Sequence, residues 1–300
     1  MGFQDSVPRS GSLSIHARVA GTTPSTWEDP SLVQLWGPHY SLFVVAARDV
    51  AVFTLGLLPD DTKAKSKAEA TAERLHTFLR GRRMTYGEAG HGLGVHPNSL
   101  RYGAPTGRIL IRWEGARLPT VWTVAAPDVD PGVARLELAR RYLHIYGPTT
   151  SGSFARWAGI APRSAAAAFD ALGPSLTAVR TPIGDAWLLA RDEPSVGAGD
   201  PVAPARLLPS GDPFFLLHGA DRELMVPDAN RRGALWTSRV WPGALLVEGE
   251  IVGTWRRAGP VVTVETWRRL GRSARDAVEA EAASLPLPGL DRTIVVGWSG

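Results

Sequence analysis

Side chains able to contact an anionic partner are concentrated in two stretches of this 300-residue chain. Residues 80–124 carry seven arginines against two glutamates, a local charge of +5, and residues 131–165 carry five arginines against one glutamate, a local charge of +4. Lysine occurs only at positions 63, 65 and 67. Because the arginine guanidinium matches the geometry of phosphate and guanine, these stretches predict a nucleic-acid partner.

Small polar side chains accompany the arginines at positions that suit contacts with bases. Imidazole, amide, hydroxyl and guanidinium groups on two short predicted helices can bond to base edges or phosphates, and arginines on the strands that follow are expected to contact phosphates. The candidate DNA-binding residues are His96, Asn98, Ser99, Arg101, Arg108, Arg112, Arg163, Ser164 and Arg180. For any single helix residue in this set, an ordinary solvated helix face is an equally good interpretation.

The elements that must position these residues occur twice in the same order: two short helical segments, a tight turn and a β-hairpin. In the first copy, Gly90, Gly92 and Gly94 are expected to form the turn, and the hairpin to close at Gly115. The predicted elements of this copy are helices from Thr85 and over 96–102, and strands over 108–113 and 120–124. Those of the second are helices over 149–157 and 162–172, a turn at Gly159, and strands over 176–180 and 186–189.

This order is typical of the winged helix-turn-helix, and its repetition predicts an α+β protein with tandem winged-helix units before a β-rich C-terminal domain. The N-terminal part predicts a short helix over 11–19, a hairpin of 32–36 and 42–46, and helices over 49–57, 62–79 and 132–146. After a linker at 195–205, strands are expected over 244–247, 251–255, 261–265 and 293–298, with a helix over 266–284. The expected domains are 1–58 (a partial first winged-helix unit), 59–128, 129–194 and 205–300.

Composition narrows the class of protein. The chain is 44% hydrophobic and 21% charged, with a net charge of +4 and no cysteine. The composition is typical of a soluble globular protein, and the lack of cysteine fits a reducing cytoplasm and excludes disulfides and thiolate chemistry. We expect a monomer that is cytoplasmic and associated with the nucleoid. No apolar run is long enough for a membrane span. We expect no cofactor and no metal, because the nearest pair of histidines, His91 and His96, lacks a third ligand nearby.

Three segments resemble the AlkZ/YcaQ-like DNA glycosylase superfamily of winged-helix proteins. They are Gly103–Trp113 (GAPTGRILIRW), Asp221–Asp228 (DRELMVPD) and Trp241–Arg256 (WPGALLVEGEIVGTWR). The resemblance implies three winged-helix units and a β-rich region that enclose duplex DNA. It also implies hydrolysis of N-glycosidic bonds to alkylated N7 purines and the unhooking of interstrand crosslinks.

The same resemblance implies a catalytic segment at Gly2–Ser6. Members of the superfamily carry a glutamine, one intervening residue, and then a glutamine or aspartate. Here Gln4 occupies the first position and Ser6 the second, with Asp5 between them as a substitute if the backbone turns. An alkylated N7 purine is a cationic leaving group, so the enzyme need only place a water molecule and stabilise an oxocarbenium-like sugar. A helical segment is expected before Gly2, which suggests that the native chain begins upstream of Met1.

Two further hypotheses stay open beside a glycosylase of alkylated or crosslinked DNA. Because Ser6 is a poor base and carries no charge, the chain is alternatively a non-catalytic winged-helix DNA binder or regulator. In a third interpretation, the winged-helix units bind other proteins and never contact DNA.

Overall fold

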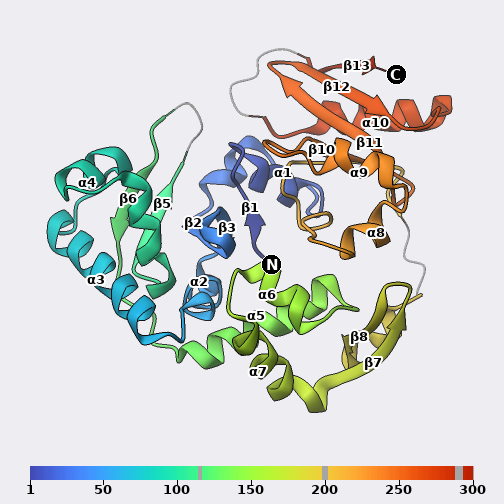
Figure 1. Ribbon diagram of the computed structural model, residues 1–300. Coiled ribbons are helices and arrows are strands. Elements are labelled where there is room, and N and C mark those ends of the chain that lie inside the picture. Colours follow the sequence, from blue (N-terminus) through green and yellow to red (C-terminus); the bar gives the residue numbers. More distant parts are fainter. Residues whose placement is uncertain (114–116, 198–201, 288–292, 300) are drawn as a thin grey trace. The chain divides into compact units, whose positions relative to one another are not determined.

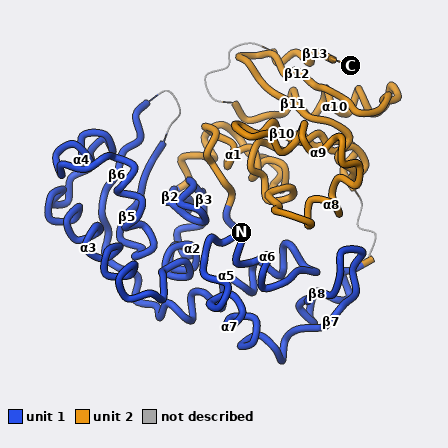
Figure 2. The backbone as a smooth tube through the Cα atoms, in the orientation of Figure 1, with its two compact units in different colours: residues 1–2, 30–196 blue, residues 3–29, 197–300 orange. Residues whose placement is uncertain are grey.

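The computed structural model describes residues 1–113, 117–197, 202–287 and 293–299; Gly115, the expected hairpin turn, lies outside these ranges. The chain has a mixed α+β fold, as the sequence predicted (Figure 1). It divides into two compact units, which Figure 2 shows in different colours. Unit 1 contains Met1–Gly2 and Pro30–Val196, and unit 2 contains Phe3–Asp29 and Gly197–Gly300.

Unit 1 begins with the predicted hairpin. Strands β2 (Leu32–Trp36) and β3 (Leu42–Ala46) pair antiparallel, with Leu32 opposite Ala46 and Trp36 opposite Leu42. Short turns of helix follow, namely η3 (Ala47–Asp49), α2 (Val50–Thr54) and η4 (Leu55–Leu57). Helix α3 (Thr62–Leu79) then starts where the Asp61 carboxylate accepts a hydrogen bond from the amide of Ala64 at 2.8 Å, an N-cap that satisfies one free backbone donor.

The first predicted helix pair packs on α3. Helix α4 (Tyr86–Gly92) opens with a reciprocal capping box between Thr85 and Glu88, and η5 (Pro97–Thr106) follows. Strands β4 (Met84–Thr85), β5 (Ile109–Arg112) and β6 (Thr120–Thr123) form a sheet in the order β4-β6-β5. Leu75, Leu79, Leu100, Ile109 and Val121 are among the buried side chains that these elements share as a core.

Two local expectations for this segment are wrong. Helix α4 runs through Gly90 and Gly92, and only Gly94, with a φ of 66°, turns the chain. A Cβ atom at Gly90 would lie 2.7 Å from Cα of Pro97, and one at Gly92 would lie 2.2 Å from the Phe78 ring, so these glycines permit close packing. The second element is a 3₁₀ helix that continues to Thr106, with Ser99 donating to the carbonyl of His96 at 2.8 Å.

The second predicted copy follows helix α5 (Pro131–Tyr146), which Asp130 caps. Helix α6 (Ser151–Ala158) ends at Gly159, whose φ of 70° makes the expected turn, and α7 (Pro162–Leu172) begins with proline in its first turn. Strands β7 (Leu176–Thr181) and β8 (Gly184–Leu189) form the antiparallel hairpin. The ring of Tyr142 on α5 lies 5.2 Å from that of Phe154 and 5.1 Å from that of Trp157, which joins α5 to α6.

Unit 2 is built on a five-stranded sheet in the order β13-β12-β11-β10-β9. The strands are β9 (Ala205–Leu208), β10 (Gly243–Val247), β11 (Glu250–Ala258), β12 (Val261–Thr266) and β13 (Val295–Ser299). Side chains alternate along β10: Leu245 and Val247 join a core with helix α10 (Arg272–Ser284), whereas Ala244 and Leu246 join a second core. That second core is covered by residues 215–241, which include α8 (Asp221–Met225) and α9 (Ala229–Leu235).

The N-terminal part of unit 2 consists of β1 (Phe3–Gln4), α1 (Ser10–His16) and η1 (Pro24–Glu28). The expected helix over 266–284 begins six residues late, because Thr266 still pairs with Gly253 as the last residue of β12. Elements β9, α8 and α9 were not expected.

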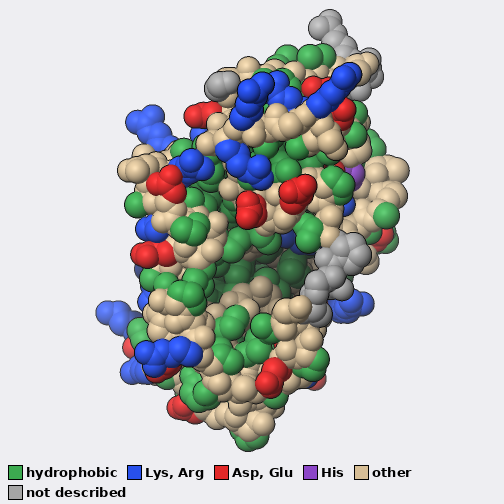
Figure 3. Space-filling model, turned by 90° about the vertical axis from the view of Figure 1, so that its right-hand side faces the viewer, with side chains coloured by type: hydrophobic (Ala, Val, Ile, Leu, Met, Phe, Trp, Pro, Cys, Tyr) green, Lys and Arg blue, Asp and Glu red, His purple; other side chains and the backbone are tan. Residues whose placement is uncertain are grey.

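Among the described residues no helix is long and apolar enough to cross a membrane. Figure 3 shows one face, on which basic and acidic side chains are interspersed.

Candidate active site and nucleic-acid interface

The segment Phe3–Ser6 presents two of its polar side chains together. The side-chain amide of Gln4 donates a hydrogen bond to Oγ of Ser6 at 2.9 Å. Gln4 is half-buried and Ser6 is exposed. The strand ends at Gln4 and the chain bends at Ser6, so the two side chains meet on one side of the segment, where a water molecule can bond to both.

Asp5 points away from this pair and has a structural role. Its side chain is fully buried, and its carboxylate accepts a hydrogen bond from the amide of Gly11 at 2.8 Å and one from Oγ of Ser10 at 3.4 Å. Both partners lie in the first turn of α1, where backbone donors are free and a negative charge is favoured. The carboxylate therefore fixes the segment to α1, and we leave Asp5 out of the proposed reacting groups.

A loop of unit 2 supports the Gln4 side chain. At Gly211, whose φ is 74°, an added Cβ atom would lie 3.0 Å from Oε1 of Gln4 and 3.1 Å from its Cδ. The next residue, Asp212, is fully buried and forms two hydrogen bonds with Arg18, at 2.7 and 2.8 Å. The Arg18 guanidinium also lies 5.5 Å from the centre of the Phe3 ring. Arg18, Gly211 and Asp212 together constrain the strand that carries Gln4.

No sequence pattern indicated this support. Arg18 and Asp212 are separated by 194 positions, and neither belongs to a motif. The one signal in the sequence is Gly211-Asp212 followed by Pro213, a combination that is typical of a turn and says nothing of its partner.

The candidate residues on η5 are partly engaged with one another. The ring of His96 accepts a hydrogen bond from the amide of Asn98 at 3.2 Å, and the Asn98 side chain accepts one from the hydroxyl of Tyr86 at 2.5 Å. His96 and Asn98 are exposed, whereas Ser99 and Arg101 are half-buried. The N-terminal end of η5 thus offers Asn98, and the preceding N-cap residue His96, to a partner.

The arginines on or beside the strands differ in availability; Arg108, expected on a strand, lies just before β5. Arg108 pairs with Glu73 on α3 at 2.7 Å, while Arg112, at the end of β5, is half-buried. Arg180 pairs with Asp185 across the tip of the β7–β8 hairpin at 3.2 Å, with both side chains more than four-fifths exposed. Ion pairs this exposed are weak, so a phosphate can displace the carboxylate from Arg180.

On α7, Arg163 and Ser164 are not equivalent. Arg163 is exposed, but Ser164 is buried and its hydroxyl donates to the carboxylate of Asp60. Burial would raise the pKa of Asp60, but hydrogen bonds from Ser164 and Arg135 outweigh it and lower that pKa. Ser164 thus joins α7 to the start of α3, and we leave it out of the proposed interface.

Comparison with known proteins places this chain in a family. The model of the family described as "DNA glycosylase AlkZ-like" matches residues 1–286. The chain belongs to this family. Over 161 residues it is 29% identical to an interstrand DNA cross-link repair glycosylase of Streptomyces sahachiroi, and the match covers 51% of this chain and 42% of that protein.

The match to this curated relative therefore spans less than half of the relative's length. The structure is also similar to that of the Streptomyces sahachiroi DNA glycosylase AlkZ, with a TM-score of 0.78 over 99% of this chain and 91% of the other. At 19% sequence identity, that likeness concerns the fold.

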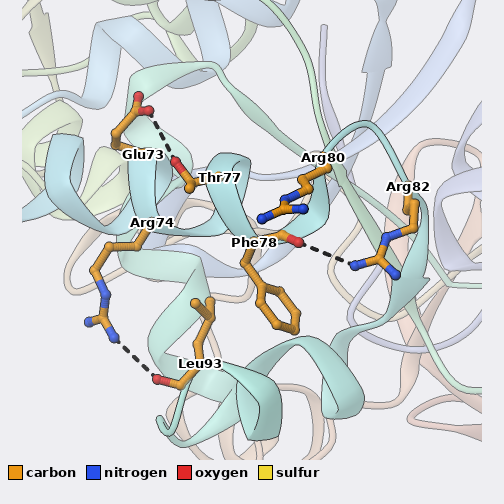
Figure 4. Close-up of a pocket in the computed structure, with 7 residues that line it drawn as sticks. All are labelled: Glu73, Arg74, Thr77, Phe78, Arg80, Arg82 and Leu93. Carbon is orange, nitrogen blue, oxygen red and sulfur yellow. Dashed lines mark hydrogen bonds between the residues drawn. The ribbon is translucent and has the colours of Figure 1, made fainter.

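This AlkZ-like protein has a pocket of about 650 Å³ beside the end of α3, which the sequence did not indicate. Figure 4 shows Phe78 and Leu93 together with the charged and polar side chains that line the pocket. Arg74 donates to the carbonyl of Leu93 at 3.1 Å, and Arg82 donates to that of Phe78 at 3.3 Å. These arginines are used to satisfy backbone carbonyls, so the pocket is a product of packing between α3 and α4. In the described parts of the chain, no three His, Asp or Glu side chains are grouped to hold a metal ion.

Proposed function

We propose that this protein is a DNA glycosylase that hydrolyses the N-glycosidic bond of alkylated, cationic purines such as N7-alkylguanine, including crosslinked ones. Membership of the AlkZ-like family supports the reaction class. The observation that carries the assignment to residues is the Gln4–Ser6 pair, whose side chains meet at 2.9 Å while Asp5 is withdrawn into the cap of α1.

The proposed reaction needs little activation by Gln4 and Ser6, because the base is already a good leaving group. A purine alkylated at N7 already carries the positive charge that makes it leave, so the transition state is an oxocarbenium-like sugar approached by water. In the proposed mechanism, the Gln4 amide N–H and the Ser6 hydroxyl hold that water beside the developing positive charge. The loop at Gly211 limits movement of the amide, because Oε1 and Cδ of Gln4 lie against the side of this residue on which a Cβ atom would project.

For binding, we propose that the segments 59–128 and 129–194 act as winged-helix units on duplex DNA. In this proposal the units use the exposed His96 and Asn98 of η5 and Arg163 of α7 to reach the duplex, and the strand arginines to contact phosphates. Ser99 and Arg101, which are half-buried, contribute less. No cofactor is required for this reaction.

Removing the first pair of strand arginines should weaken the salt dependence of duplex binding. In the Arg108→Ala, Arg112→Ala double variant, we expect the slope of log affinity against log salt to fall by ~0.9 for each phosphate that the protein no longer neutralises. Because Glu73 competes for Arg108, Glu73→Gln should strengthen binding, whereas Glu69→Gln, an exposed acid on the same helix, should have a smaller effect. An unchanged slope in the double variant would remove these arginines from the interface.

Restoring the second glutamine of the family pattern should improve catalysis. We expect Ser6→Gln to raise release of N7-methylguanine from a duplex oligonucleotide about 10-fold, because a second amide can orient the water. Ser66→Gln, at an exposed position of α3, is the control and should leave the rate unchanged. The assay is single-turnover release of the base, with a lesion-free duplex as the blank. A wild-type protein that releases no base and a Ser6→Gln variant that also releases none would refute the glycosylase proposal.

Ser6 itself supports a second candidate function. Because a serine stands where the family pattern has a glutamine or aspartate, the chain is alternatively a DNA binder that has lost catalysis. That candidate predicts tight duplex binding without base release by the wild-type protein.

A further inference from the structure

An arginine of unit 2 lies close to two tryptophan rings. The guanidinium carbon of Arg222, on α8, is 5.0 Å from the ring centre of Trp236 and 5.4 Å from that of Trp241. Trp236 is buried, and its indole N–H donates to the carbonyl of Phe215 at 3.0 Å. The Trp241 ring centre lies 6.4 Å from that of Phe215. The two ring contacts and a hydrogen bond from Nε to the carbonyl of Leu217 restrain the guanidinium.

Arg222 has more donors than it uses. Its Nε donates to the carbonyl of Leu217 at 2.8 Å, but within the described parts of the chain neither terminal nitrogen has a hydrogen-bond or ion-pair partner. The indole N–H of Trp241 also has no acceptor among these residues. The neighbouring carboxylate of Glu223 is directed to Arg232, at 3.7 Å. Three N–H-bearing nitrogens at this site are therefore available to an acceptor.

The electrostatics of this position favour a negative ligand. Burial lowers the pKa of Arg222, which reflects the cost of keeping its charge partly out of water, and no carboxylate offsets that cost. Cation–π contacts with two indoles compensate only in part. A guanidinium with a fixed plane and free terminal donors matches the bidentate geometry of a phosphate.

We propose that Arg222 and Trp241 form an oxyanion-binding site that takes a backbone phosphate of duplex DNA. The choice of DNA as the source of the phosphate rests on the proposed function, whereas the oxyanion chemistry does not. This assignment gives a role to the segment Asp221–Asp228, which carries Arg222.

The test compares two arginines of unit 2 at equal net charge. Arg222→Met removes the guanidinium and keeps the aliphatic part. Arg257→Met removes an exposed arginine whose one hydrogen bond to the described residues is to the carbonyl of Gly259. We expect Arg222→Met to weaken binding to a lesion-free duplex about 10-fold and to lower the salt slope by ~0.9. Arg257→Met should change affinity less than about twofold, and Arg222→Lys should lie between, because an ammonium lacks the fork.

A second measurement does not depend on how the variants fold. In the wild-type protein, the ¹⁵N signals of the Arg222 guanidinium and the Trp241 indole should shift on titration with inorganic phosphate, and again with the duplex. Shifts that occur with inorganic phosphate but not with the duplex would support the oxyanion site and overturn its assignment to DNA. Two results would show that Arg222 has only a structural role beside the two tryptophans. One is an equal loss of affinity in both methionine variants; the other is a lower melting temperature in Arg222→Met with unchanged duplex binding. Because the duplex carries no lesion, absence of base release would leave these results intact.

Discussion

Replacing Gln4 by alanine is expected to lower release of N7-methylguanine from duplex DNA by at least about 100-fold. The loss of one preorganised hydrogen-bonding group at the reacting centre typically costs this much in the rate of the chemical step. Gln4 is also the only residue of the segment that matches the family pattern and keeps a side-chain amide beside Ser6. The measurement is the single-turnover rate at saturating protein, so that changes in binding do not contribute.

Two variants separate this role from general damage to the segment. Ser6→Ala removes the hydroxyl that accepts the hydrogen bond from Gln4 and should cost less, about 10-fold, because the amide stays. Gln4→Ala should bind lesion-free duplex as the wild type does, since the change removes no charge. Base release that is indifferent to Gln4 would assign the chemistry to another residue.

Local signals in the sequence were sufficient to predict the bounds of an element where a single turn or cap defines it. The pair β2–β3 and helix α7 begin and end at the predicted residues, because Gly37-Pro38, Gly159 and Pro162 leave the backbone few alternatives. The same reasoning was wrong at Gly90 and Gly92, where the absence of a side chain serves contact with Pro97 and Phe78. A glycine needed for close packing looks the same in sequence as one needed for a turn.

The candidate site shows the same limit more strongly. The spacing of Gln4 and Ser6 predicts that both side chains point one way, and their hydrogen bond agrees with this. The withdrawal of Asp5 into the cap of α1 depends on how the chain folds back over the next six residues. The support from Arg18 and Asp212 depends on a contact across 194 positions, which no periodicity encodes.

The second large effect that we expect is on stability, and it concerns the ion pair of Arg18 and Asp212. We expect Arg18→Met to reduce the free energy of unfolding by about 3–5 kcal/mol, because it leaves the fully buried carboxylate of Asp212 without a countercharge. Asp212→Asn should reduce the free energy of unfolding by less. The amide keeps an oxygen that can accept from the backbone N–H of Phe214, which lies 2.9 Å from the carboxylate. The side chain of Arg18 is 27% exposed and can be solvated by water. The measurement is urea unfolding followed by tryptophan fluorescence.

The matched control is the exposed pair of unit 1, Arg180 and Asp185. Arg180→Met should cost less than about 1 kcal/mol, because water replaces the missing partner of an ion pair at the surface. If Arg18 positions Gln4 through Asp212 and Gly211, Arg18→Lys should keep most of the stability yet still slow base release, since a lysine can retain the charge but cannot donate to both carboxylate oxygens in the same geometry. Two results would contradict this role: base release at the wild-type rate in Arg18→Lys, or an Arg18→Met protein as stable as the control. Either result would mean that contact with α1, and not this ion pair, holds the strand that carries Gln4.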